Sequence, residues 1–269
     1  MNNIQIIPTG GLCNRMRVMA SGVFLAQAYH LPAQIIWIID NGLKAEFEDL
    51  FKPLSPDIAT TKTNTKWLYN ISGTKDYLLR WPLLHLRHQT IFNFDFLDYG
   101  GNIFDHINKS ANKDLLLISC FPMCQDYPFD QLFVPQEDIQ ERIDSIVKLF
   151  APNTIGIHVR RTDNIESIRQ SPLELFIEKM RKEIEQDPHV CFYLASDDKT
   201  VKEELQCLFP NQIMTSNGNT LRDNLEGMKF AVTELYCLSK TNKIIGSHYS
   251  SYSHIAAQLG KIPIEYARK

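Results

Sequence analysis

Two adjacent arginines end a mostly apolar run in the second half of the chain. The run covers residues 155–159, and Arg160, Arg161 and Asp163 follow it directly. An arginine is always charged, and its planar guanidinium binds phosphate oxygens in pairs. Two arginines at the end of a buried strand could therefore hold a diphosphate without a metal ion, with Asp163 orienting one of them. The alternative is a structural ion pair from either arginine to Asp163 or Asp197.

Two loops contain further groups that suit an anionic ligand. The hydroxyls of one loop lie between a predicted strand and a predicted helix, where the free N–H groups of a helix N-terminus add donors, although one serine could simply cap the helix. The glycines of the other loop let a ligand approach the backbone, although a tight turn explains them equally well. That loop matches neither GxGxxG nor GxxxxGK. The residues concerned are Ser247, Ser250 and Ser251 in one loop and Gly10, Gly11 and Asn14 in the other.

Three carboxylates are also candidates for the site. Asp197 and Asp198 precede a predicted helix, where capping is the ordinary role of an aspartate. Glu234 lies at the edge of the apolar stripe of a predicted helix over residues 221–239. A carboxylate in that position needs a partner. We expect either a guanidinium of the core or a nucleobase that carries N–H donors.

The surrounding pattern predicts the elements that position these residues. Short β-branched or apolar runs alternate with helical periodicity, which is typical of a parallel, doubly wound α/β sheet. Ligands of such sheets bind beyond the carboxyl ends of the strands, which is where the candidate residues fall. Strands are predicted over residues 4–7, 34–39, 154–159, 190–195, 212–215, 243–246 and 262–266. Helices are predicted over residues 14–28, 172–186, 199–209, 221–239 and 252–259.

A domain boundary is predicted near residue 150, in the segment Phe150-Ala151-Pro152-Asn153. Two Rossmann-like halves, 1–150 and 151–269, would then face a cleft; one continuous sheet is the alternative. The pattern is weak over residues 41–150. The aromatic residues there are more typical of a core than of a surface that stacks on sugars. They are Trp67, Tyr69, Tyr77, Trp81, Phe92, Phe94, Phe96, Tyr99 and Phe104.

Bulk properties exclude several classes of function. The 269 residues carry a net charge of −3, which argues against nucleic acid as the main partner. There is no apolar run long enough for a membrane span, and the first residues predict a strand rather than a signal peptide. Six cysteines within apolar patterns indicate mostly buried free thiols and a cytoplasmic protein. There is no DxD, HExxH, GxSxG or CxxC motif, so no metal ion or cofactor is expected.

Taken together, the motifs resemble those of the GDP-fucose-dependent fucosyltransferases of the α-1,6 type, including the bacterial nodulation enzymes. More distantly they resemble the α-1,2 and protein O-fucosyltransferases. The resemblance lies in GIHVRRTDN (156–164), FYLASDDKTVKEEL (192–205) and TELYCLSKTNKIIGSHYSSYSHIAAQLG (233–260), with GGLCNRMRVMASGVFLAQAYH (10–30) similar to the glycine-rich first loop. Order and spacing agree over residues 1–30 and 154–260, and residues 41–150 are not covered.

The resemblance implies an inverting, metal-independent transferase of the two-domain GT-B type, with GDP-fucose as donor and a glycan hydroxyl as acceptor. Residues 151–269 would bind the GDP-sugar, and residues 1–150 would lie on the acceptor side. Arg160 would hold the β-phosphate and Ser250 would touch the diphosphate. His158 and Glu234 would contact guanine, and Asp197 and Asp198 would shape the nucleotide pocket.

This chain departs from the family pattern at two positions. Glu234 stands where the family often has Asp, and Asn164 stands where the α-1,6 enzymes have Lys. Glu166, the nearest acid after Asp163, is the candidate general base. Two other functions fit the same residues: a transferase for another nucleotide sugar, and a non-catalytic nucleotide-binding protein of the same fold.

Overall fold

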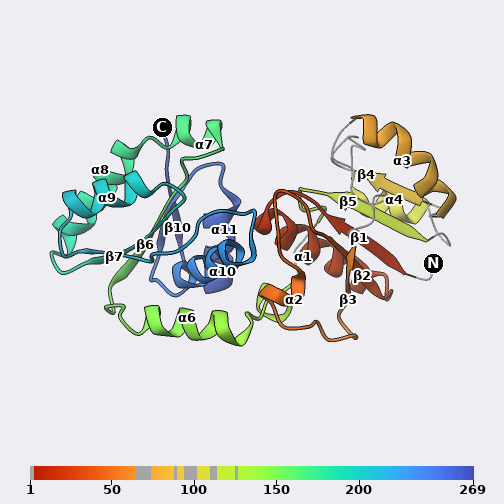
Figure 1. The fold of residues 1–269 in the computed structure, drawn as a ribbon, viewed down its shortest axis with the longest axis horizontal. Helices are drawn as coiled ribbons and strands as arrows, with labels where there is room; N and C mark the ends of the chain where they lie inside the picture. The colour runs from red at the N-terminus through yellow and green to blue at the C-terminus, as the bar shows by residue number, and fades with distance from the viewer. Residues whose placement is uncertain (1–2, 65–73, 88–89, 94–101, 110–113, 125–126) are drawn as a thin grey trace. The chain divides into compact units, whose positions relative to one another are not determined.

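A computed structural model describes residues 3–64, 74–87, 90–93, 102–109, 114–124 and 127–269 (Figure 1). The chain divides into two compact units. The first comprises Met1–Gln136 with Arg222–Met228, and the second comprises Glu137–Leu221 with Lys229–Lys269. Each unit contains its own five-stranded parallel sheet. The α/β class with two sheets is therefore confirmed, and the single-sheet alternative is wrong.

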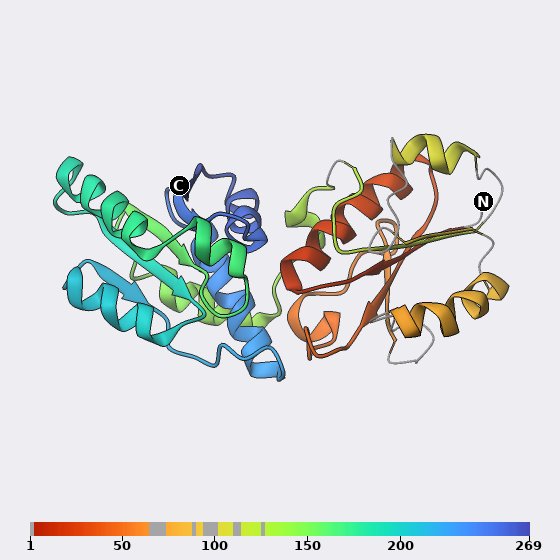
Figure 2. The same cartoon turned by 90° about the horizontal axis from the view of Figure 1, so that it is seen from above.

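The first unit has the strand order β3-β2-β1-β5-β4. Its central strands β1 and β5 read as nearly continuous apolar runs because both faces of a parallel sheet are covered. Figure 2 shows the long helix α1 lying along this sheet. The strands are β1 (Ile4–Pro8), β2 (Ala33–Ile38), β3 (Thr60–Asn64), β4 (Thr90–Asn93) and β5 (Leu115–Ser119); the helices are α1 (Leu12–Ala28), α2 (Phe47–Leu50), α3 (Thr74–Arg87), α4 (Ile103–Lys109) and α5 (Phe129–Leu132).

The second unit has the strand order β10-β9-β6-β7-β8, with every neighbouring pair parallel. From β6 the chain builds outward through β7 and β8, and then returns to add β9 on the other side of β6. The strand order thus reverses between β6 and β9. The strands are β6 (Thr154–Val159), β7 (Cys191–Ser196), β8 (Ile213–Thr215), β9 (Ile244–Ser247) and β10 (Ile264–Ala267); the helices are α6 (Glu137–Val147), α7 (Ile165–Gln170), α8 (Leu173–Gln186), α9 (Lys199–Leu208), α10 (Leu225–Ser239) and α11 (Ser251–Gly260).

Helices cover both faces of the second sheet (Figure 1). Phe176 and Met180 of α8 and Leu205 of α9 pack with β6 and β7 in one apolar core. On the opposite face Gly156 of β6 approaches Leu238 of α10. All six residues of β6 are buried, so His158 belongs to a strand that is enclosed on both sides.

The predicted elements are found with shifted ends. Helix α10 begins at Leu225 rather than at 221, because the Asn224 side chain accepts the N–H of Gly227 and so fixes a later start. The unit boundary lies at residue 136 rather than near 150, because α6 belongs to the second unit. Short α7 was not predicted, since it has only six residues and begins with an exposed isoleucine, Ile165.

Residues 41–150 contain strands and helices that the sequence pattern did not reveal. Of the aromatic residues there, Phe92 is buried and Phe104 stacks on Tyr29. The side chains of Trp67, Tyr69, Tyr77, Trp81, Phe94, Phe96 and Tyr99 lie outside the described residues.

The cysteines and helices bear on two further predictions. No disulfide joins any of the six cysteines, all of which lie in described segments. However, only Cys13 and Cys237 are buried and Cys207 is exposed, so the expectation of mostly buried thiols was wrong. Among the described helices, none combines the length and the apolar character that crossing a bilayer requires.

Gly246 offers a test of the packing between β9 and α11. A methyl group there would lie 2.5 Å from both Cβ and Oγ of Ser253. Gly246→Ala should therefore push α11 away from the sheet and lower the free energy of unfolding by about 1–3 kcal/mol. Urea denaturation monitored by circular dichroism would measure this loss. An unchanged midpoint would show that α11 can shift at no cost.

Candidate functional site

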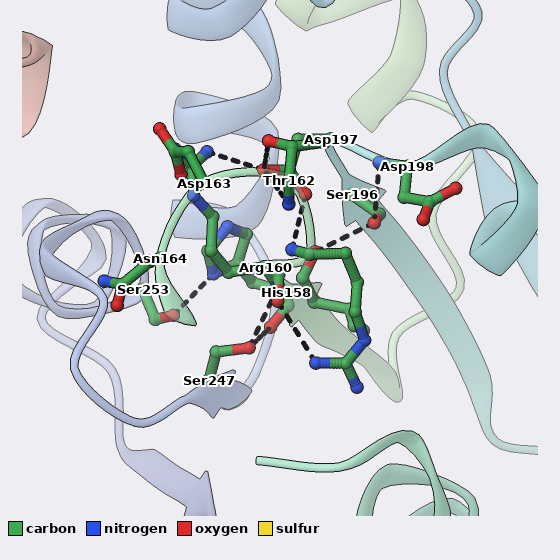
Figure 3. A network of polar contacts seen from close by, with 12 residues as sticks. His158, Arg160, Thr162, Asp163, Asn164, Ser196, Asp197, Asp198, Ser247 and Ser253 are labelled. Atoms are coloured by element: carbon green, nitrogen blue, oxygen red, sulfur yellow. Dashed lines mark hydrogen bonds and ion pairs between the residues drawn. The ribbon is translucent and has the colours of Figure 1, made fainter. Parts of the chain in front are cut away.

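The loop after β6 is held by one carboxylate from the end of β7. Asp197 accepts hydrogen bonds from the backbone N–H of Arg161 at 2.8 Å and from the Thr162 hydroxyl at 2.6 Å. The Thr162 N–H approaches the same carboxylate at 3.3 Å, and Nη1 of Arg160 forms an ion pair with it at 2.8 Å. Figure 3 shows these groups converging from neighbouring strand ends. Asp197 therefore fixes both the backbone of this loop and the direction of the Arg160 guanidinium.

Two serine hydroxyls secure the end of β6 itself. Ser247 of β9 accepts the N–H of Arg160 at 3.0 Å and donates to the carbonyl of His158 at 3.3 Å. Ser196 of β7 donates to the carbonyl of Val159 at 2.8 Å. Because a hydroxyl has a single proton, Ser247 has no donor left for a phosphate while this arrangement holds.

Arg160 lies between two carboxylates. Its Nη2 forms an ion pair with Asp163, and its side chain is 16% exposed. Burial acts to raise the pKa of Asp197, but Arg160 and the donors from Thr162 and Arg161 outweigh it, so the pKa of Asp197 is lowered. The structural ion pair foreseen as an alternative is thus present. A guanidinium has five N–H donors, so Arg160 can be oriented by the two carboxylates and still donate to an anion.

The Arg161 guanidinium has hydrogen-bond partners for only some of its N–H donors. Its Nη1 donates to the carbonyl of Arg160 at 3.1 Å, and its Nη2 is buried without a hydrogen-bond partner among the described residues. Burial lowers the pKa of this guanidinium, although Asp197, Glu174 and Asp198 act in the opposite direction. A buried N–H donor without an acceptor is costly, so an anion at this position would remove a penalty.

His158 forms an aromatic corner beside the arginines. Its Nδ1 lies 2.7 Å from Oγ of Ser253, and its ring stacks on Tyr252 with centroids 4.8 Å apart. The Tyr252 hydroxyl donates to the carbonyl of Ala231 on α10 at 2.5 Å. Burial, reinforced by the charge of Arg160, lowers the pKa of His158 to about 3. The imidazole is therefore neutral at physiological pH and can serve as a hydrogen-bonding group but not as a cation.

Within the protein, the charged partner of Glu234 is a lysine, and its predicted contact with a nucleobase stays a prediction. Its Oε1 forms an ion pair with Nζ of Lys202 on α9 at 2.8 Å, and both side chains are almost fully buried. The expectation of a core guanidinium was wrong: the charged partner is an ammonium. Lys202 was not singled out in the sequence, because an amphipathic helix such as α9 is expected to expose its lysines.

Several predicted residues act at helix starts. Asp198 caps α9 by accepting the N–H of Thr200, so the capping role applies to it and not to Asp197. Asn164 caps α7 and donates to the carbonyl of Tyr249 at 2.9 Å. Glu166, the candidate base, is exposed on α7 and paired with Arg169 at 2.7 Å.

The start of α11 leaves its backbone donors without a side-chain cap. Ser250 occupies the N-cap position and makes no side-chain capping bond, and Ser251 is the first helical residue. Tyr249, just before them, is 61% exposed and has a φ of 58°, which is uncommon for a bulky residue. These N–H groups therefore remain suited to an anion.

The glycine-rich loop belongs to the first unit, at the carboxyl edge of its own sheet. Gly10 has a φ of 77°, and Asn14 accepts a hydrogen bond from Arg17. The loop is fixed by Arg15, whose Nε donates to the carbonyl of Gly10 at 2.7 Å and whose Nη2 pairs with Asp40 at 2.7 Å. Sequence reasoning missed Arg15, although an arginine within the apolar pattern of a helix was a signal that could have found it.

The Arg15 guanidinium is fully buried. It lies over the ring of Trp37, 5.2 Å from the centroid, and Nη1 donates to the carbonyl of Ile38. Gly11 has an extended backbone and no side-chain cap for α1. Across the residues that the structure describes, no cluster of three His, Cys, Asp or Glu side chains could hold a metal ion.

Comparison with solved structures defines the fold class. The chain has a GT-B-like fold of two Rossmann-like sheets and superimposes on NodZ α-1,6-fucosyltransferase soaked with GDP-fucose, with a TM-score of 0.63 and 17% identity over 96% of this chain and 93% of that one. A variant of FUT1 from Arabidopsis thaliana in complex with GDP gives 0.62 and 14%, over 100% and 71%. POFUT1 in complex with GDP gives 0.58 and 13%, over 98% of both chains. No protein-family profile and no curated protein sequence matches the chain.

Asp197→Asn should weaken the loop after β6 in a pH-dependent way. The free energy of unfolding at neutral pH should fall by about 1.5–3 kcal/mol, since charge-assisted hydrogen bonds are lost. Because the pKa of Asp197 is lowered on folding, its contribution is complete above about pH 4 and disappears as the pH falls below it. Urea titrations between pH 3 and 7 should thus show less acid destabilisation in the variant.

Asp198→Asn is the matched control, because asparagine caps a helix as well as aspartate does. It should leave the unfolding free energy nearly unchanged. Equal losses in the two variants would contradict a special role for Asp197.

Proposed function

We propose that the protein is an inverting, metal-independent glycosyltransferase that transfers L-fucose from GDP-fucose to a hydroxyl of a glycan acceptor. The observation that carries the proposal is the placement of Arg160 and Arg161 at the point between β6 and β9 where the strand order reverses. Ligands of doubly wound sheets bind at such a point. The resemblance of the motifs and the fold shared with transferases solved with GDP or GDP-fucose support this donor.

In the proposed mechanism the second unit stabilises the leaving group. As the bond to the fucosyl carbon breaks, charge develops on the diphosphate of GDP. Arg160, already oriented by Asp163 and Asp197, and the uncapped N-terminus of α11 at Ser250 and Ser251 supply donors that need no reorganisation. Such preorganised donors are the usual main source of electrostatic catalysis. The orphaned Nη2 of Arg161 is a further donor for the same anion.

The nucleoside is assigned to the corner formed by His158 and Tyr252. A neutral imidazole that is fixed through Nδ1 by Ser253 can present Nε2 to a ligand. Glu234 is assigned to the base, and Asp198 to the wall of the pocket. Ser247 is assigned to the support of the β6 end instead of direct phosphate contact, because its hydroxyl proton is already in use.

The acceptor side of the reaction is assigned to the first unit, with Gly10, Gly11 and Asn14 in the loop that Arg15 fixes. Glu166 remains the candidate for the base that takes the proton of the acceptor hydroxyl. Because Glu166 is exposed and paired with Arg169, this role requires the carboxylate to leave that pair when the acceptor binds.

A nucleotide panel tests the donor. GDP and GDP-fucose should raise the thermal midpoint of the protein, whereas UDP and ADP should not. A ligand at about 100 times its dissociation constant adds roughly 2.7 kcal/mol of stability. A shift with GDP-mannose but not GDP-fucose would point to another nucleotide sugar, and binding without donor hydrolysis or transfer would point to a non-catalytic protein. No shift with any nucleotide would contradict the proposal.

Arg160→Ala should nearly abolish transfer from GDP-fucose, because the charge of the leaving group loses its main partner. Activity should fall below a tenth, which corresponds to more than about 1.4 kcal/mol of transition-state stabilisation. Donor hydrolysis and transfer would be measured by release of GDP. Arg181→Ala on the exposed surface of α8 is the control for loss of a positive charge. A variant that retains more than a tenth of the activity would remove Arg160 from the mechanism.

A further inference from the structure

The buried ion pair between Lys202 and Glu234 has no role in the mechanism above beyond the assignment of Glu234 to the base. Nζ of Lys202 lies 2.8 Å from Oε1 of Glu234, 3.1 Å from the carbonyl oxygen of Ser216, and 5.5 Å from the centre of the Phe230 ring. The two side chains are only 10% and 8% exposed. Lys202 thus binds Oε1 of the carboxylate, and among the described residues no hydrogen-bond partner is found for Oε2.

Helix α10 connects the pair to the corner assigned to the nucleoside. Glu234 and Ala231 are three residues apart on α10 and so lie on one face of that helix. The carbonyl of Ala231 accepts the hydroxyl of Tyr252, which stacks on His158. Asp197 at the end of β7 also interacts electrostatically with Glu234. Lys202 comes from α9, which begins directly after Asp198.

Lys202 favours the charged form of Glu234, against the effect of burial. Burial raises the pKa of Glu234 to about 7; the charge of Lys202 and its hydrogen bond act to lower it, and Asp197 acts to raise it. The other titratable groups that face it are Tyr193 and Cys237, whose pKa values are raised by burial, that of Cys237 to about 12. Both are therefore uncharged at neutral pH, and Lys202 is the cation that favours the carboxylate form.

Stability alone does not explain such a pair. Removing two charges from water costs several kcal/mol each, and a buried ion pair replaced by apolar residues of similar volume frequently leaves a protein as stable or more stable. A carboxylate beside a ligand pocket has a different use, because the ionised form accepts hydrogen bonds on both oxygens. Guanine has adjacent N–H donors that suit it, one of them the exocyclic amine.

We propose that Lys202 is a positioning residue, which holds Glu234 as a carboxylate through Oε1 so that Oε2 accepts the N–H donors of the nucleobase. This inference rests on the proposed function and deepens it, since it makes recognition of the base depend on a residue of α9. Loss of Lys202 leaves a lone buried carboxyl group, which takes up a proton and no longer accepts hydrogen bonds on both oxygens.

The test is the pH dependence of GDP-fucose affinity, measured by calorimetry between pH 6 and 9. GDP-fucose is the probe because, unlike GDP, it has no terminal phosphate that titrates near pH 6. Wild-type affinity should rise with pH with a midpoint near 7, following ionisation of Glu234. Lys202→Met should move this midpoint upward by at least about one unit and weaken binding about fivefold at pH 7, with recovery at high pH. Glu234→Gln should bind weakly at every pH, without the rise.

A double variant that removes both charges separates an effect on GDP-fucose binding from an effect on folding. Lys202→Met combined with Glu234→Leu should unfold at the same urea concentration as wild type or higher, yet lose at least about tenfold in GDP-fucose affinity. Wild-type affinity and pH dependence in Lys202→Met would overturn the role of Lys202 while leaving the proposed function intact. Wild-type affinity in the double variant would also overturn the assignment of Glu234 to the base. Failure of the wild type to bind GDP-fucose at any pH would instead overturn the proposed function and this inference together.

Discussion

The candidate site of the second unit depends on the contacts that the carboxylate of Asp197 makes with the loop after β6. This carboxylate comes from the end of β7, yet it binds the backbone and side chains of the loop that follows β6. A loop at a strand end has unpaired backbone donors that must be satisfied somewhere. By accepting the N–H groups of Arg161 and Thr162, Asp197 fixes this loop as a support for the Arg160 guanidinium. It also orients the Arg160 guanidinium, which keeps further N–H donors for a ligand.

An arginine–aspartate pair also fixes strand ends in the first unit, but there the arginine, not the aspartate, binds the backbone of the loops. There a buried arginine, Arg15, comes from the helix and binds the carbonyl of Gly10, the carbonyl of Ile38 and the carboxylate of Asp40. It thereby joins the loops that follow β1 and β2 at the carboxyl edge of that sheet. In each unit, one arginine–aspartate pair holds two neighbouring strand ends together, so the loops at each edge are fixed by ion pairs and hydrogen bonds. Rigid support of this kind is what a binding or catalytic group needs if its geometry is to be kept.

Several buried ionisable groups lie around the corner formed by His158 and Tyr252, to which the nucleoside is assigned. His158 is uncharged because it is enclosed by the sheet and α11, and Asp197 is ionised because Arg160 and several donors surround it. Burial raises the pKa of Glu234 to about 7, and Lys202 acts against burial by favouring the carboxylate form. Perturbed ionisation of several neighbouring groups is more typical of a functional site than of an ordinary core. The strand order gives the reason for their proximity, because β6, β7 and β9 are adjacent in the sheet although they are distant in the chain.

The sequence by itself determined the α/β class, the order of the elements after residue 150 except short α7, and the segments at which the strand ends would gather. It could do so because hydrophobic periodicity and helix signals are local. Only the tertiary structure decided which charged groups pair. It selected Lys202 for Glu234, two aspartates for Arg160, and Arg15 for the glycine-rich loop, and it showed Asp198 rather than Asp197 as the cap of α9. These choices depend on contacts between residues far apart in the chain, and the residue types alone allow several partners for each charge. The weak pattern over residues 41–150 has the same cause, since short elements there take their shape from packing against the sheet rather than from local propensity.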